Sequence, residues 1–220
     1  MGGLTREHVV TAALTVSFLR YPSPPSGWVE ALPRSRGALP LAVAAPGHLL
    51  LACPAGEACW IGLVAGPQGP SSLVAVAAEL ASGERVDLAT GAAPGRDRRR
   101  DGFAVPPRFA VEGIARRDGG WWALTREPAA PPAPACAALE LLVWTGPAAA
   151  APPERGPRPQ HDPGGPIGRP RPAAGPAAPA GPPAVLRVDL VDPARFEAAG
   201  GPRLPEPADE EATYRGWRLP

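Results

Sequence analysis

Leu14-Thr15-Val16-Ser17-Phe18 is the stretch that decides the fold class, because apolar and polar side chains alternate strictly along it. In an extended backbone, successive side chains point to opposite faces, so the three apolar residues would share one face. Tyr21-Pro22 follows a few residues later and predicts the end of the extended run. We therefore expect a β-strand that buries one face in a core.

Short apolar segments recur along the chain, separated by turns rich in Gly and Pro. The further expected strands span residues 39–44, 48–52, 59–64, 73–78, 85–88, 109–114, 121–125 and 139–145. Ser82-Gly83 and Asp118-Gly119-Gly120 predict hairpin turns. Residues 73–80 are ambiguous, because their alanines and Glu79 suit a helix as well as a buried strand. The even spacing predicts a mainly β fold, a small sandwich or barrel-like body.

The segment 147–184 is dominated by Pro, Ala, Gly and Arg. With so few large apolar side chains it cannot offset the entropy of ordering its backbone, so we expect a disordered linker. It would divide the chain into a β-rich body, residues 1–146, which folds alone, and a C-terminal tail, residues 185–220. This organisation is typical of interaction proteins.

The tail begins with the clearest amphipathic pattern of the chain. Leu186–Leu190 alternates apolar and charged residues, which predicts an edge strand that adds to the sheet of the body or of a partner. Asp192-Pro193 and Gly200-Gly201 predict the start and stop of a short helix.

Four residues near the end of the sequence form a candidate protein-binding motif: Tyr214, Arg215, Trp217 and Arg218. Trp, Tyr and Arg are enriched at binding hot spots, so these side chains are predicted to dock into a partner. The alternative is that the tail folds back onto the body.

All 22 basic residues are Arg, and the sequence contains neither Lys nor Asn. Together with the abundance of Ala, Pro and Gly, this bias indicates a GC-rich bacterium or a GC-rich DNA virus. The formal net charge of +1 argues against a globally basic nucleic-acid binder. The one dense basic loop contains Arg96, Arg98, Arg99 and Arg100. It is predicted to be a solvated loop, or else a nuclear-import signal or phosphate contact.

Cys53, Cys59 and Cys136 are too few, and odd in number, for a disulfide framework, which favours an intracellular compartment. The spacing of the three cysteines and His48 fits no structural zinc site, so we expect the cysteines to be packing residues and the protein to bind no metal. No apolar run approaches the about 18 residues that a membrane helix needs, so no membrane span is expected.

The usual catalytic patterns are missing from the sequence. There is no Gly-x-Ser-x-Gly elbow and no Lys for a phosphate loop, and only His8, His48 and His161 could act as a base near neutral pH. We therefore expect no enzyme, no cofactor and no small-molecule substrate. Two alternatives stay open. One is a degenerate enzyme fold whose cleft would be lined by His48 and convergent carboxylates. The other is a weak nucleic-acid binder.

The nucleic-acid alternative requires the basic loop to merge with Arg108, Arg116 and Arg117 into one exposed stripe.

Several short motifs are spread over residues 32–145: Leu32-Pro33-Arg34, Gly37, Pro46, Leu49-Leu50, Glu57-Ala58-Cys59 and Leu141-Leu142-Val143-Trp144-Thr145. They resemble landmarks of the small alphaherpesvirus accessory protein of the unique long region, which gathers in the host nucleus. The resemblance implies a non-enzymatic viral protein found in nuclear assemblies of the host. Other proteins, viral or host, are the expected partners. The cytoplasm is the alternative location.

Overall fold

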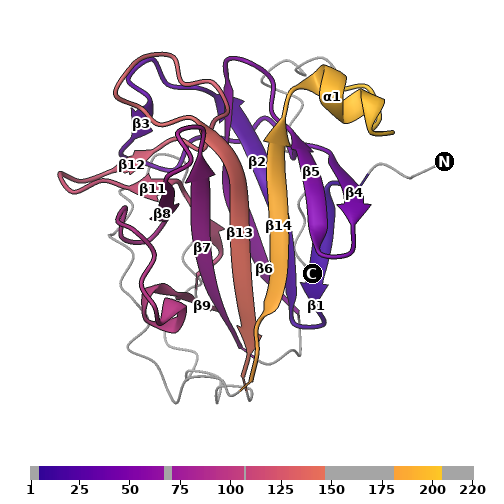
Figure 1. Cartoon of the computed structure of the whole chain (residues 1–220), viewed down its shortest axis with the longest axis vertical. Helices are drawn as coiled ribbons and strands as arrows, with labels where there is room; N and C mark the ends of the chain where they lie inside the picture. The colour runs from indigo at the N-terminus through magenta and orange to yellow at the C-terminus, as the bar shows by residue number, and fades with distance from the viewer. Residues whose placement is uncertain (1–4, 67–70, 107, 147–180, 205–220) are drawn as a thin grey trace.

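The computed structural model of the chain describes residues 5–66, 71–106, 108–146 and 181–204. These residues form a mainly β fold (Figure 1), as predicted. The strands are β1 (Glu7–Thr11), β2 (Leu14–Pro22), β3 (Trp28–Val29), β4 (Leu41–Ala45), β5 (His48–Ala52), β6 (Glu57–Ala65), β7 (Ser72–Leu80), β8 (Arg85–Asp87), β9 (Phe103–Val105), β10 (Ala110–Val111), β11 (Ile114–Ala115), β12 (Trp121–Trp122), β13 (Cys136–Thr145) and β14 (Ala184–Val191). One short helix, α1 (Pro193–Ala198), and a 3-10 turn, Arg98–Asp101, complete the set.

The described residues form two larger sheets and one small sheet. The large sheet has the order β4-β5-β14-β13-β7-β8, with β9 also paired to β7. The second sheet has the order β1-β2-β6-β10, and the small one has the order β11-β12-β3. Every pairing is antiparallel except that of β14 with β5. The two larger sheets enclose one main core, which makes a sandwich.

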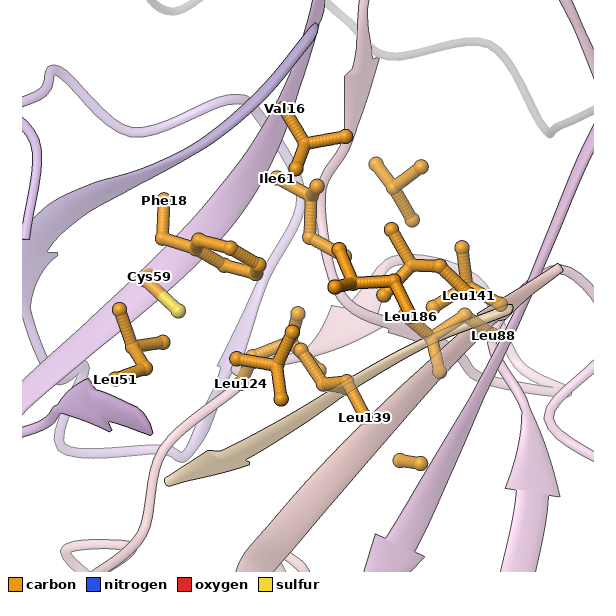
Figure 2. Close-up of a cluster of buried hydrophobic side chains, with 14 of the residues drawn as sticks. Val16, Phe18, Leu51, Cys59, Ile61, Leu88, Leu124, Leu139, Leu141 and Leu186 are labelled. Carbon is orange, nitrogen blue, oxygen red and sulfur yellow. The ribbon is translucent and has the colours of Figure 1, made fainter. Parts of the chain in front are cut away.

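The core follows from the alternation that predicts the first strand. Val16 and Phe18 of β2 are fully buried, and Ile61 of β6 lies beside them. Figure 2 shows them facing Leu139 and Leu186 of the large sheet. Burial of apolar surface from both sheets is the main term that stabilises such a sandwich.

The ambiguous segment 73–80 is a strand, not a helix. It pairs with β13 over the whole of β7 and with β8 through the predicted turn at Ser82-Gly83. Its outward-facing Ala75 and Ala77 are buried, and the 3-10 turn contacts this strand. The small side chains of Ala75 and Ala77 on the outer face allow the turn to lie close to the strand, and these alanines are among those that make the segment resemble a helix in sequence.

The strand predicted at 186–190 is β14, and it lies inside the large sheet between β5 and β13. It is therefore not an edge strand. Its Leu186, Val188 and Leu190 belong to the main core. The large sheet thus combines strands that precede residue 147 in the sequence with a strand that follows residue 180. Most of the predicted linker, residues 147–180, lies outside the described residues. This placement argues against a body of residues 1–146 that folds alone.

The predicted short helix is confirmed as α1. The Oδ1 atom of Asp192 accepts a hydrogen bond of 2.8 Å from the backbone N–H of Arg195, and Gly200 follows the helix with φ of +87°. Phe196 is fully buried against Leu50 on the outer face of the large sheet. Within the part of the chain that the structure describes, no helix is long and apolar enough to cross a membrane.

The hairpin predicted at Asp118-Gly119-Gly120 is present between β11 and β12. The strand predicted for 109–114 is divided, because β10 pairs with β6 whereas β11 pairs with β12. Gly113 separates the two parts, and a Cβ atom there would lie 2.1 Å from the carbonyl oxygen of Trp122. The chain therefore leaves one sheet and enters another at this glycine.

Candidate functional site

The predicted basic loop is largely occupied by contacts within the chain. Arg98 is 13% exposed, with Nη2 3.6 Å from Oδ2 of Asp87 and Nη1 3.7 Å from Oε1 of Glu140. The Nε atom of Arg100 lies 3.3 Å from Oδ2 of Asp97. The Arg98 contacts join the 3-10 turn to β8 and β13, so this guanidinium stabilises the edge of the large sheet.

Arg99 makes a further internal contact. Its guanidinium stacks on the ring of Trp144 at 5.5 Å, and its Nη2 donates a hydrogen bond of 3.0 Å to the carbonyl oxygen of Gly181. It thereby joins the ends of β13 and β14. Arg96 is exposed. Arg98 and Arg99 are thus engaged within the chain, whereas Arg96 and Arg100 are exposed, and a role in import or phosphate contact stays a prediction.

The four predicted docking residues of the tail, Tyr214, Arg215, Trp217 and Arg218, lie outside the described residues.

His48 lies on the outer face of the large sheet, where its side chain is 32% exposed. Its Nε2 atom is 3.0 Å from Oδ2 of Asp189. Arg187 donates a hydrogen bond of 2.8 Å from Nε to Oδ1 of Asp189 and one of 3.0 Å from Nη1 to Glu79. These residues form a chain of hydrogen bonds and ion pairs on the surface of the sheet, not the cleft that a degenerate enzyme would need.

The three cysteines are buried and free. Burial raises the pKa of the Cys53 thiol to about 11 and raises those of Cys59 and Cys136 as well. A thiol with a raised pKa is a poor nucleophile and metal ligand near neutral pH. No group of three or more His, Cys, Asp and Glu side chains suited to a metal ion occurs in 5–66, 71–106, 108–146 and 181–204.

Two of the three arginines proposed for a basic stripe, Arg108 and Arg116, are engaged within the chain. Arg108 forms an ion pair with Glu112 and stacks on the ring of Phe103 at 5.1 Å. Burial raises the pKa of Glu112, and Arg108 partly opposes that effect. The Arg108 side chain is therefore engaged within the chain and is not a free cation for the exposed stripe that the nucleic-acid alternative requires.

The small sheet holds an arginine between two tryptophans, a cluster that the sequence analysis did not find. The Arg116 guanidinium lies 4.2 Å from the ring centre of Trp28 and 4.7 Å from that of Trp122. It also forms an ion pair with Asp118. Cation–π contacts to tryptophan are strongest when the cation is shielded from water, and the Arg116 side chain is only 13% exposed.

Backbone geometry at two glycines makes this cluster possible. Gly119 and Gly120 have φ of +103° and +71°, values that favour glycine in a tight turn. A Cβ atom on Gly120 would lie 2.7 Å from the carbonyl oxygen of Val29. The turn therefore lets β3 approach β12, and the register places Trp28 directly opposite Trp122.

Two hollows flank the β11–β12 hairpin. The larger, of about 470 Å³, has an apolar lining formed by Leu80, Val86, Ile114, Trp122, Pro132 and Pro134. The smaller, of about 200 Å³, is lined by Thr90, Trp121, Gly119 and Gly120, among others. Arg116 and Arg117 line both hollows, and Asp118 lines the larger.

Arg117 differs from Arg116 in its surroundings. Its side chain is exposed, and it has no ion-pair or hydrogen-bond partner among the residues that the structure describes. We call Trp28, Arg116, Arg117 and Trp122 the tryptophan–arginine site. It combines a fixed aromatic stack, an available cation and an adjoining apolar hollow. That set can bind a ligand that carries both charge and apolar surface.

Comparison with known proteins provides no relative for this chain: no family model matches it, and no curated protein or solved structure is significantly similar to it. Function therefore has to be inferred from the geometry of the chain's own residues.

Proposed function

We propose that this protein is a non-enzymatic accessory protein that acts by binding other proteins. The observation that carries the proposal is the tryptophan–arginine site on the β11–β12 hairpin. Tryptophan and arginine are the residue types most enriched at binding hot spots. Figure 1 shows this hairpin projecting from the side of the sandwich, where a partner can reach it.

The stacking of Arg116 supports the proposal, because it fixes the site before a partner arrives. A guanidinium held between Trp28 and Trp122 keeps few alternative rotamers, so little side-chain entropy remains to be lost on binding. Preorganised side chains of this kind increase affinity without a larger contact area.

The four tail residues Tyr214, Arg215, Trp217 and Arg218 form the second part of the proposal, supported by their composition. They would bind a different surface of the partner from the one held by the hairpin.

The test is chemical cross-linking and affinity capture with the full-length chain in cells. We expect Trp122→Ala and Arg117→Glu to lose partners that the wild-type chain captures. The matched control is Arg6→Glu, which reverses an exposed charge beside β1, on the opposite side of the view in Figure 1. An unchanged set of captured proteins in both hairpin variants would contradict the proposal.

A small-molecule site is the second candidate function, and one observation favours it. A hollow of about 310 Å³ is lined by Tyr21, Val29, Ser35 and three prolines. The Tyr21 hydroxyl is buried and has no hydrogen-bond partner among the residues that the structure describes, and burial raises its pKa, so it stays a donor. Fragment screening by NMR tests this: ligands that bind the wild-type chain should lose affinity in Tyr21→Phe.

We further propose that the chain acts in the host nucleus during infection by a GC-rich DNA virus. The support is the resemblance of residues 32–145 to an alphaherpesvirus accessory protein and the composition of the chain. Imaging of the tagged full-length protein should show nuclear assemblies. A purely cytoplasmic distribution would contradict this part of the proposal.

A further inference from the structure

We propose that the tryptophan–arginine site recognises an acidic segment of a partner protein, in which a carboxylate stands next to a large apolar side chain. This inference rests on the proposed function, since it names the chemistry of the partner at the same site. Three features of the hairpin support it: its charge, its apolar hollow and its geometry.

The charge at the hairpin favours an anion. Arg116 is paired with Asp118 and stacked between the two tryptophans, so its charge is already compensated in part. Arg117 is exposed and adds a second positive charge on the same turn. A guanidinium binds carboxylates with two parallel hydrogen bonds, and such charge-assisted bonds are stronger than neutral ones.

The hollow beside Arg117 favours an apolar neighbour of that carboxylate. Its volume of about 470 Å³ exceeds that of one large side chain, and three of its lining residues, Leu80, Val86 and Ile114, belong to the main core. Pro132 and Pro134 also line it, and proline side chains lose little entropy on contact. A leucine or phenylalanine of the partner would therefore find a preformed apolar surface.

The position of Arg117 joins these two features. It lines both the apolar hollow and the smaller, more polar hollow beside Gly119 and Gly120. A peptide that crosses the hairpin can thus place its carboxylate on Arg117 and its apolar side chain in the larger hollow. Asp118 on the same turn repels carboxylate and phosphate alike, so it does not distinguish them; the apolar lining of the larger hollow is what favours a peptide with a large apolar side chain over nucleic acid.

The test uses full-length protein and a fluorescent peptide of alternating Glu and Leu residues, with binding read as anisotropy. Two comparison peptides replace every Glu by Gln, or every Leu by Ser. We expect each replacement to weaken binding by about tenfold, because each removes one of the two required contacts.

Variants of the chain locate the binding. Arg117→Gln and Arg117→Glu should each weaken binding of the Glu–Leu peptide by about tenfold or more, with the larger loss in the charge reversal. Arg6→Glu should bind as the wild type does. Because Arg117 is exposed, its substitution leaves the fold intact, and the thermal unfolding temperature checks this.

Three outcomes would overturn the inference. They are equal affinity for the Glu and Gln peptides, unchanged affinity in both Arg117 variants, and tighter Arg117-dependent binding of a single-stranded oligonucleotide than of the Glu–Leu peptide. If the hairpin variants still lose cellular partners while any of these holds, the proposed function stands and only the acidic chemistry is wrong. If neither partners nor peptide depend on the hairpin, both proposals fail.

Discussion

At the scale of single residues, several of the arginines that the structure describes contact other parts of the same chain. Arg98 joins the 3-10 turn to Asp87 and Glu140, and Arg116 joins the three strands of the small sheet. Such arginines cover apolar rings with the guanidinium plane while they satisfy carboxylates at its edge. Arg117 stands out because it lies on the same turn and remains exposed.

Arg116→Ala should lower the free energy of unfolding by about 2 kcal/mol, because it removes two shielded cation–π contacts and an ion pair. Arg117→Ala, on the neighbouring exposed residue, should change it by less than about 0.5 kcal/mol. Chemical denaturation of both variants measures the difference. Equal losses would show that the stack around Arg116 does not stabilise the fold.

The stability should also depend on pH through Asp87. Burial raises the pKa of this carboxyl above its ordinary value of 3.8, so the folded state holds the proton more tightly than the unfolded state. Its contribution to stability is therefore largest at low pH and falls as the pH rises from 3.8.

Asp87→Asn removes this titration and keeps the Oδ1 acceptor for the backbone N–H groups of Ala89 and Thr90. We expect the stability of the wild type, relative to this variant, to decrease as the pH rises above 3.8. Urea denaturation across that range provides the measurement. A relative stability that increases with pH would mean that Arg98 outweighs burial and lowers the pKa of Asp87.

At the scale of elements, β14 connects the two parts of the large sheet. It pairs parallel with β5 and antiparallel with β13, so both of its edges are hydrogen-bonded. Its alternate residues divide between the core and the outer face, where Arg187 and Asp189 form ion pairs. A strand with both edges paired and one face in the core contributes to the whole sheet.

Leu186→Ala should therefore cost about 2–5 kcal/mol, the range for truncation of a fully buried leucine. Val185→Ala is the matched control on the same strand, since Val185 is 53% exposed, and should cost less than about 0.5 kcal/mol. Thermal or urea unfolding distinguishes the two. Similar small losses for both would indicate that β14 does not belong to the cooperative unit.

At the scale of the whole molecule, the sandwich is completed by residues that follow the segment 147–180. Without β14, β5 and β13 would both lose a partner, and the core would lose Leu186, Val188 and Leu190. Unpaired internal strands expose backbone groups and apolar surface at the same time. The chain should therefore fold as one unit.

A fragment of residues 1–146 should lack a cooperative unfolding transition and should bind hydrophobic dyes, as molten states do. Addition of a synthetic peptide of residues 181–204 should restore near-UV dichroism, because it supplies β14 and α1. A fragment that unfolds cooperatively by itself would show that residues 1–146 form an independent body.

The sequence by itself determines the local elements of this protein. Alternation places β2, a short apolar run between turns places β5, and the cap at Asp192 with the stop at Gly200 places α1. These signals are local, because side-chain period and end caps involve residues only a few positions apart. The sequence does not predict β1 as a separate strand, since Glu7–Thr11 shows no strict alternation.

Only the tertiary structure decided which strands pair and which side chains meet. The alternating pattern in 186–190 suits an edge strand as well as an internal one. Only the structure shows that β14 is internal, with β5 paired to one of its edges and β13 to the other. The stack of Trp28, Arg116 and Trp122 likewise joins distant parts of the sequence. Local sequence patterns determine whether a segment is a strand or a helix. Which strands it pairs with depends on the burial and hydrogen bonding of the complete sheet.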